Sequence, residues 1–221
     1  MKPKSKSDET RARILAAAIE LFRTRGFAAT TMREIAAASG VATGAAYYYF
    51  DSKDAIVLAF YEYAARELEP LVEEALAGAK ELEARIRAML EVKLRYFEPD
   101  RPLLVALAGH TDPQHPLSPF SAQTRHIRER DMKFFERALE DSHVRIARDL
   151  EGLLPRILWM YQMGLILFWI HDRSPGQKRT HALLEQSAGA VAGLIKLSAF
   201  PLLRPVRRRV VTLIETMSGT D

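Results

Sequence analysis

Aromatic hydroxyls and one lysine are concentrated in a short stretch near the amino end of the chain. Tyr47, Tyr48, Tyr49 and Phe50 are consecutive, and Lys53 follows two polar residues later. Four consecutive aromatics on a short helix cannot all face one core, so some must face solvent, where a tyrosine hydroxyl can donate to a phosphate. A lysine in the first turn of a helix adds its charge to free backbone amides, which bind phosphate oxygens. These residues predict phosphate contacts. For the tyrosines alone, a solvated loop with an aromatic core cluster is the alternative.

Two short helices around a tight turn are expected to position these side chains. Thr31 precedes Glu34 by three residues, which is the spacing of a capping box. Gly40 ends the first helix because glycine adopts the left-handed conformation, and Val41 fills the turn with an apolar side chain. A second helix then covers residues 43–50. Helix, glycine turn and helix form the pattern whose second helix enters the DNA major groove.

The run from Arg11 through Ala59 resembles the DNA-binding domain of the TetR family of transcriptional regulators. The matching segments are LFRTRGF, TTMREIAAASGV and GAAYYYFDSKDAIV. The resemblance implies an all-helical homodimer that binds a palindromic operator in double-stranded DNA, usually as a repressor that a small-molecule effector releases. Ala42 stands where the family often has a capping serine, and Ala45 stands where a hydroxyl or amide side chain is common. These two alanines weaken the polar contacts expected of the reading helix.

The reading helix lacks the side chain that most often contacts a base. No arginine or lysine lies between Glu34 and Ser52, so a bidentate arginine–guanine contact would have to come from Arg33 on the preceding helix. We expect Tyr47 to reach a base edge, with much of the specificity coming from Arg33 and DNA shape. The residues expected to contact DNA, several of them at phosphates, are Thr31, Arg33, Thr43, Gly44, Ala45, Tyr47, Tyr48, Tyr49 and Lys53.

The sequence offers little to support catalysis. It has no cysteine, so a disulfide, a thiolate zinc site and a thiol nucleophile are all excluded. Glu140 and His143 have the Glu-x-x-His spacing of a di-iron ligand pair, but no second pair exists. His110, Asp112 and His115 lie in a segment crowded by prolines. There is also no glycine-rich phosphate loop and no nucleophile-elbow serine. We expect no metal, no cofactor and no enzymatic activity.

Charge and hydropathy favour a cytoplasmic protein that does not enter a membrane. The net charge of +4 permits nucleic-acid binding without requiring it. The first residues are charged and lack the apolar core of a signal peptide. The apolar segment Ile157–Ile170 is shorter than the roughly 20 residues that a membrane-spanning helix needs.

The remaining chain shows helical periodicity and no alternating strand pattern. We therefore predict an all-α fold, with a three-helix helix-turn-helix DNA-binding domain at residues 1–52 and a larger helical ligand-binding and dimerisation domain at residues 53–221. Pro70 is expected to kink or end the helix that begins at Lys53. The helices expected after Pro70 cover residues 71–97, 103–108, 120–141, 143–171, 177–198 and 202–217.

Two helices near the carboxyl end are expected to form a homodimer interface. The segment Ile157–Ile170 is apolar on every side, which requires burial on every side. The next helix carries small residues that allow close backbone approach. We expect both helices to meet their copies in a symmetric four-helix interface, with internal two-helix packing as the alternative. The predicted interface residues are Leu158, Leu165, Ala188, Gly189, Ala192 and Gly193.

Residues 54–221 exceed what is needed to join two small DNA-binding heads, and their aromatics and methionines suit a pocket for an apolar or amphipathic ligand. For each candidate taken singly, ordinary core is the alternative. The candidates are Met89, Tyr96, Phe97, His110, Met132, Phe135, Trp159, Gln162 and Met163. The competing function is a helical adaptor that binds protein or lipid but no DNA, and a DNA-binding assay separates the two.

Overall fold

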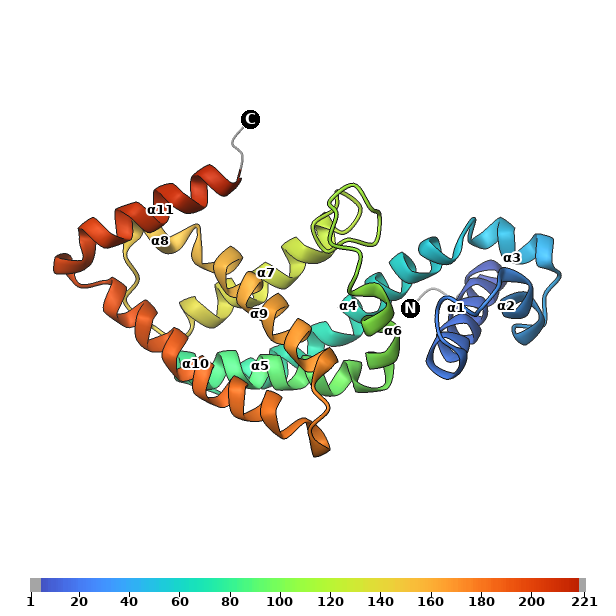
Figure 1. Ribbon diagram of the computed structural model, residues 1–221, viewed down its shortest axis with the longest axis horizontal. Helices are drawn as coiled ribbons and strands as arrows, with labels where there is room; N and C mark the ends of the chain where they lie inside the picture. The colour runs from blue at the N-terminus through green and yellow to red at the C-terminus, as the bar shows by residue number, and fades with distance from the viewer. Residues whose placement is uncertain (1–4, 219–221) are drawn as a thin grey trace. The chain divides into compact units, whose positions relative to one another are not determined.

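The chain is all-α throughout the part that the structure describes, as the sequence predicts. The structure is a computed structural model, and it describes residues 5–218 (Figure 1). The helices are α1 (Lys6–Arg25), α2 (Met32–Ala38), α3 (Thr43–Tyr49), α4 (Lys53–Ala77), α5 (Leu82–Phe97), α6 (Arg101–Leu107), α7 (Arg125–Glu140), α8 (Arg148–Glu151), α9 (Leu154–His171), α10 (Lys178–Ser198) and α11 (Arg204–Ser218), with short 3-10 turns η1 (Glu98–Asp100), η2 (Pro175–Gln177) and η3 (Pro201–Leu203).

Helix α4 runs through Pro70, so the predicted helix over residues 71–97 is wrong. The chain breaks between Ala77 and Leu82 instead. The guanidinium of Arg85 donates to the carbonyls of Leu76 (2.9 Å) and Ala79 (2.8 Å). These bonds satisfy backbone acceptors that the end of α4 leaves without helical partners.

The predicted helix over residues 143–171 is also divided. His143 adopts a left-handed backbone with φ of 51°, and an irregular segment separates it from α8. Helix α9 begins at Leu154, with Pro155 in its first turn. Proline suits that position because an amide in the first turn has no partner within the helix. Pro155 therefore marks the start of a helix rather than a kink within one.

The described residues divide into two compact units. One unit, called the head here, is formed from the ranges Met1–Leu68 and Tyr96–Arg128. The other, called the body, is formed from Glu69–Arg95 and Glu129–Asp221. Helices α4, α5 and α7 each contribute residues to both units.

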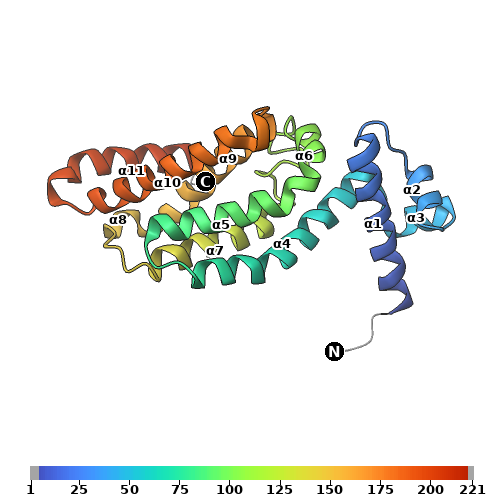
Figure 2. The ribbon, with the colours of Figure 1, turned by 90° about the horizontal axis from the view of Figure 1, so that it is seen from below.

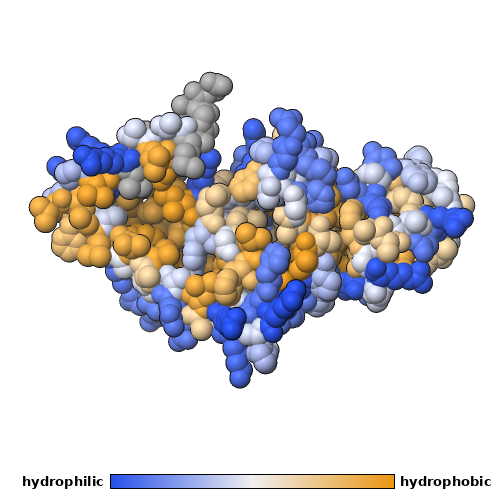
Figure 3. Space-filling model, viewed as in Figure 1, coloured by the Kyte–Doolittle hydropathy of each residue, from blue (hydrophilic) through white to orange (hydrophobic). Residues whose placement is uncertain are grey.

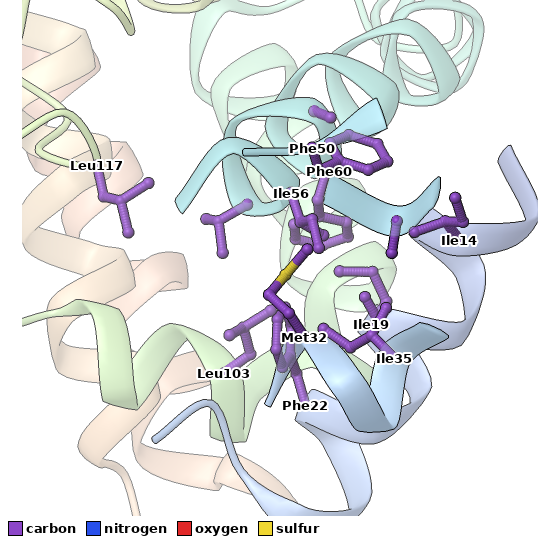
Figure 4. Packing of buried hydrophobic residues seen from close by; sticks show 14 of the residues in the cluster. Ile14, Ile19, Phe22, Met32, Ile35, Phe50, Ile56, Phe60, Leu103 and Leu117 are labelled. Atoms are coloured by element: carbon purple, nitrogen blue, oxygen red, sulfur yellow. The ribbon is translucent and has the colours of Figure 1, made fainter. Parts of the chain in front are cut away.

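The head has one hydrophobic core, to which α1, α2, α4 and α6 all contribute. Figure 4 shows Phe22 of α1, Met32 of α2 and Leu103 of α6 close together. Arg23 also joins α1 to η1 through a two-pronged ion pair with the buried Asp100, with N–O distances of 2.7 and 3.0 Å. Helix α6 therefore belongs to the packing that supports the helix-turn-helix.

In the body, helices α9 and α10 pack against each other (Figure 2). The buried Asp172 closes the turn between them. Its carboxylate accepts from the Ser174 amide (2.9 Å), the Thr180 amide (3.0 Å) and the Thr180 hydroxyl (2.7 Å). Burial opposes ionisation of Asp172, but the hydrogen bonds from Ser174 and Thr180 outweigh it and hold the pKa well below its usual value.

Within the described residues, no single helix has both the length and the apolar composition needed to cross a membrane. One bent pair, Pro175–Ser198 with Pro201–Ile214, meets those two criteria jointly, with a 93° bend between its parts.

Candidate nucleic-acid interface

Helix α2 begins with the capping box that the sequence predicts. The amide of Thr31 donates to the Glu34 carboxylate at 2.8 Å, and the Glu34 amide donates to the Thr31 hydroxyl at 3.3 Å. The hydrogen bond from the Thr31 amide, followed by that from its hydroxyl, lowers the pKa of Glu34. Arg25 and Arg33 lower it further by their charge. The box fixes the first turn of α2 and leaves Thr31 and Arg33 exposed.

The turn between α2 and α3 has the predicted left-handed glycine. Gly40 has a φ of 68°, and its amide donates to the carbonyl of Ala37. The amide of Val41 donates to the carbonyl of Ala36 at 3.0 Å, while the buried Ser39 hydroxyl donates to the carbonyl of Ile35. The end of α2 is therefore closed by local hydrogen bonds, which fix the direction in which the chain enters α3.

Helix α3 is anchored on one side and open on the other. Ala46 within it and Phe50 just after it are buried, whereas Thr43 and Gly44 are exposed. Tyr47 is 51% exposed and Tyr48 is 83% exposed. Ala45 and Tyr49 are half-buried. No side chain caps the start of α3, where Ala42 stands. The outward face thus offers hydroxyls, a glycine and free backbone amides.

Two of the predicted phosphate-contacting residues already have partners within the head. The Ser7 hydroxyl donates to the hydroxyl of Tyr49 at 3.5 Å. The ammonium of Lys53 donates to the carbonyl of Phe27 at 2.7 Å and lies 4.6 Å from the centroid of the Phe27 ring. Ser52 caps the start of α4, since the amide of Ala55 donates to the Ser52 hydroxyl at 3.1 Å. The phosphate contacts of Tyr49 and Lys53 stay predictions.

Sequence reasoning missed two contacts that brace α3 from α1. Besides the Ser7–Tyr49 bond, the guanidinium of Arg11 lies 4.6 Å from the centroid of the Phe50 ring. Positions 7, 11, 14 and 18 recur at helical spacing, and Ile14 and Ala18 are fully buried. That spacing is the signal that could have identified Ser7 and Arg11.

The predicted ligand-pocket residues fall into both units, and each group is described by itself. In the head, Tyr96, Phe97 and His110 are half-buried. Burial raises the pKa of Tyr96 to about 12, with further contributions from Tyr63, Glu67 and Asp100. In the body, Met132 and Met163 are half-buried, and the fully buried members are Met89, Phe135, Trp159 and Gln162.

Gln162 belongs to a group of polar side chains that we call the buried polar cluster, formed with Lys93 and Asp131. The ammonium of Lys93 donates to Asp131 Oδ1 at 2.5 Å and to Gln162 Oε1 at 2.6 Å, and Gln162 Nε2 donates to Asp131 Oδ2. The sequence prediction included Gln162 but not its partners. Lys93 follows Leu90 by three residues and Ile86 by seven, so a charge at an apolar position was the available signal. Across the described residues, no three or more His, Cys, Asp or Glu side chains gather into a possible metal site.

Most of the predicted dimer residues face the chain's own core, and their contact with a second copy stays a prediction. Leu158, Leu165, Ala188 and Ala192 are buried within the body, and Gly193 is half-buried. Gly189 is also half-buried, and a Cβ placed there would lie 3.3 Å from the Glu83 side chain. Ala188, Gly189 and Ala192 of α10 therefore take part in close packing inside the body.

A different set of apolar side chains points outward from these helices, and we call it the outer stripe. Its members recur at helical spacing and are 39–66% exposed. They are Met160, Leu167 and Phe168 of α9 with Leu183, Leu194 and Leu197 of α10. Figure 3 shows apolar side chains gathered over α10 and the connection to α11. Helix α9, which is apolar on every side, is thus buried on one face and exposed on the other.

Two family models match the chain. The model described as "Bacterial regulatory proteins, tetR family" matches residues 14–60. The model described as "Tetracyclin repressor-like, C-terminal domain" matches residues 85–213, which is more than half of the chain.

Curated relatives match over part of the chain. The HTH-type transcriptional regulator YerO of Bacillus subtilis is 46% identical over 56 residues, which is 25% of this chain and 19% of that protein. The transcriptional activator FasR of Mycolicibacterium smegmatis is 36% identical over 93 residues, 42% of each chain. This chain therefore matches less than half of the length of either relative.

Solved structures extend the likeness to most of the fold. A TetR-family regulator from Streptomyces coelicolor has a TM-score of 0.67 at 18% identity, covering 93% of this chain and 89% of its own. FadR of Thermus thermophilus, a TetR-family repressor solved with lauroyl-CoA, has a TM-score of 0.57 at 27% identity. That match covers 82% of this chain and 92% of FadR.

Proposed function

Because the chain belongs to the TetR family of transcriptional regulators and carries its DNA-binding helix-turn-helix, we propose that it is a homodimeric repressor of a palindromic operator. A small apolar or amphipathic ligand releases it from the DNA. The observation that carries this proposal is the outward face of α3, where Thr43, Tyr47 and Tyr48 are exposed while Ala46 and Phe50 hold the helix to the core. In this proposal residues 1–52 contact DNA, and residues 53–221 bind ligand and dimerise.

The proposed DNA contacts follow from exposure. Arg33 is exposed on α2, the helix that precedes the reading helix, and we assign it a guanine contact. Tyr47 projects from the middle of α3 and is assigned to a base edge. The Thr31 and Tyr48 hydroxyls are assigned to phosphates. Lys53 contacts a phosphate only if its ammonium leaves the carbonyl of Phe27 and donates to a phosphate oxygen instead.

The proposed dimer uses the outer stripe. Two copies of α9 and α10 placed face to face would bury it in a four-helix interface, and a two-fold axis would present the same patch of each copy to the other. Such an arrangement can set two α3 helices about 34 Å apart, which is one turn of the duplex.

Repression is proposed over activation because occupancy of an operator suffices for repression, whereas activation also needs a surface that engages the transcription machinery. The relatives include both kinds: FasR is named an activator, and KstR2 of Rhodococcus jostii is named a repressor. The lauroyl-CoA bound to FadR supports an effector with a long apolar portion. The ligand acts by preferring a conformation that binds DNA poorly, and it shifts the equilibrium only by that preference.

The test is to select bound fragments from a pool of random duplexes. We expect enrichment of an inverted repeat, because a two-fold dimer reads its half-sites in opposite directions. The variant Tyr47→Ala should weaken binding to the recovered sequence. The variant Tyr63→Ala is the matched control, since that tyrosine is 45% exposed on α4 and is given no DNA contact. Recovery of no shared sequence, or equal losses in the two variants, would contradict the proposal.

A further inference from the structure

The buried polar cluster joins three helices of the body at one point. Lys93 comes from α5, Asp131 from α7 and Gln162 from α9. Lys93 is 4% exposed and Gln162 is 3% exposed, whereas the Asp131 side chain keeps 23% of its surface in solvent. The rings of Phe134 and Phe135 lie beside the ammonium, with centroids 5.5 and 5.6 Å from Nζ.

Stability alone does not account for such a cluster. Desolvating an ammonium is costly, and exchanging a buried ion pair for well-packed apolar side chains is often neutral or stabilising. Removing only one partner is strongly destabilising, because it leaves a buried charge without compensation. Lys93 therefore requires an anion at all times, but a carboxylate other than that of Asp131 can also compensate its charge.

The geometry of the cluster specifies which kind of anion fits. Lys93 Nζ binds one oxygen of the Asp131 carboxylate and Gln162 Nε2 binds the other. The two donors are therefore spaced to grip both oxygens of one planar carboxylate. Asp131 is also the member that reaches solvent, so it can return to water at the lowest desolvation cost of the three.

We propose that Lys93 and Gln162 form the binding site for the carboxylate of an amphipathic effector, and that Asp131 occupies this site when no effector is bound. In the exchange, the ligand carboxylate accepts from Nζ and Nε2 while the Asp131 carboxylate moves to solvent. One anion replaces another, so the buried ammonium stays compensated. The apolar part of the ligand lies among the aromatic side chains near the ammonium. This inference rests on the proposed ligand-responsive function and names its ligand class as apolar monocarboxylates.

The test compares three probes that share one alkyl chain: decanoate and decylamine, each below its critical micelle concentration, and 1-decanol below its solubility limit. Binding to the free full-length protein is followed by the fluorescence of the two tryptophans, Trp159 and Trp169 of α9, and by the thermal unfolding midpoint. We expect decanoate to bind at least about tenfold more tightly than decanol, because hydrogen bonds to a charged group are the stronger kind. Decylamine should bind no better than decanol.

Variants of the cluster should change the affinity for decanoate in directions that a purely structural cluster would not produce. Asp131→Asn removes the competing charge and should raise the affinity for decanoate several-fold, with little effect on decanol. Lys93→Met should bring decanoate and decanol to within about twofold of each other. The matched control is Asp141→Asn, because that carboxylate pairs with the buried Arg85 at 2.6 Å elsewhere in the body. It should leave decanoate affinity unchanged.

Equal affinities of the wild-type protein for decanoate and decanol would overturn the proposal, and so would weaker decanoate binding by Asp131→Asn. If Lys93→Met fails to fold by circular dichroism, these two results still decide. The measurements use no DNA, so they are separate from the operator selection. Decanoate discrimination without any recovered operator would leave the site standing and reject the repressor. Recovery of an operator without any preference for decanoate over decanol would reject the carboxylate site and leave the repressor standing.

Discussion

Replacing Leu194 by alanine tests the outer stripe as a dimer interface. Leu194 is 66% exposed in the single chain, which makes it the most exposed member of the stripe. If two copies meet through α9 and α10, this side chain loses its solvent contact on dimerisation. If they meet elsewhere, its truncation changes nothing in the association equilibrium.

The magnitude follows from the exposed fraction. Full burial of a leucine side chain stabilises by about 1.5–3 kcal/mol. About two thirds of the Leu194 surface remains available for burial, which corresponds to about 1–2 kcal/mol per copy. A two-fold interface contains the residue twice, so the variant should lose about 2–4 kcal/mol. The dimer dissociation constant should rise roughly 30- to 700-fold.

Sedimentation equilibrium over a dilution series measures this constant directly. The matched control is Leu71→Ala, a 42% exposed leucine of α4 that lies outside the stripe, and its dimer constant should match that of the wild-type protein. The same dissociation constant for all three proteins would refute the assignment of the stripe. A wild-type protein that stays monomeric at micromolar concentration would refute the dimer itself.

Three further outcomes are expected. Arg33→Ala should reduce discrimination between operator and scrambled DNA roughly five- to 150-fold in gel shifts, because a bidentate guanine contact contributes about 1–3 kcal/mol; unchanged discrimination would reject that contact. Gly40→Ala should lower the free energy of unfolding in urea by about 1–2 kcal/mol, because its φ of 68° is strained for any residue with a Cβ. Gly44→Ala, its control within α3, should be neutral or stabilise by about 0.5–1 kcal/mol. Glu34→Ala should destabilise at neutral pH and progressively less below pH 4.5 in the same urea titrations. The folded-state pKa of Glu34 is lowered by the Thr31 hydrogen bonds, so its contribution is present above the usual value of 4.5 and is lost as the pH falls through the lowered pKa. An effect of Glu34→Ala that is independent of pH would contradict this.

The features predictable from sequence are those set by residues a few positions apart. The Thr31–Glu34 box, the left-handed Gly40 and the Ser52 cap each depend on partners within three residues, and all are present in the structure. The resemblance to a family that rests on these motifs also agrees with both family models. Local chemistry was sufficient for the fold class and for the helix-turn-helix.

Breaks that depend on distant side chains could not be predicted in this way. Periodicity continues across residues 71–97, yet α4 ends at Ala77, where the guanidinium of Arg85 donates to the carbonyls of Leu76 and Ala79. Pro70 carried a strong local signal, yet the helix passes through it to Ala77. The Arg85 contact at the end of α4 is the tertiary feature that periodicity does not reveal.

The site predictions were limited by an ambiguity of apolar patterns. Periodicity shows which side chains avoid water, but it does not show whether the chain's own core or a second copy covers them. Leu158 and Leu194 look alike in sequence, yet one is buried and the other is exposed. Small residues such as Ala188 carry the same ambiguity, because close backbone approach serves internal packing equally well.

The ion pair between Arg23 and Asp100 limits which parts of the head can move separately. Separating η1 and α6 from α1 would leave the Asp100 carboxylate, which is only 1% exposed, without the charge of Arg23 beside it. Breaking a fully buried pair costs about 3–5 kcal/mol, and solvent around the Arg23 side chain, which is 36% exposed, makes the cost smaller here. Even the reduced cost is an appreciable share of the stability of an ordinary domain. Any rearrangement that displaces α6 should therefore carry α1 with it as a single rigid piece, and α3, braced on α1 through Arg11 and Phe50, should follow.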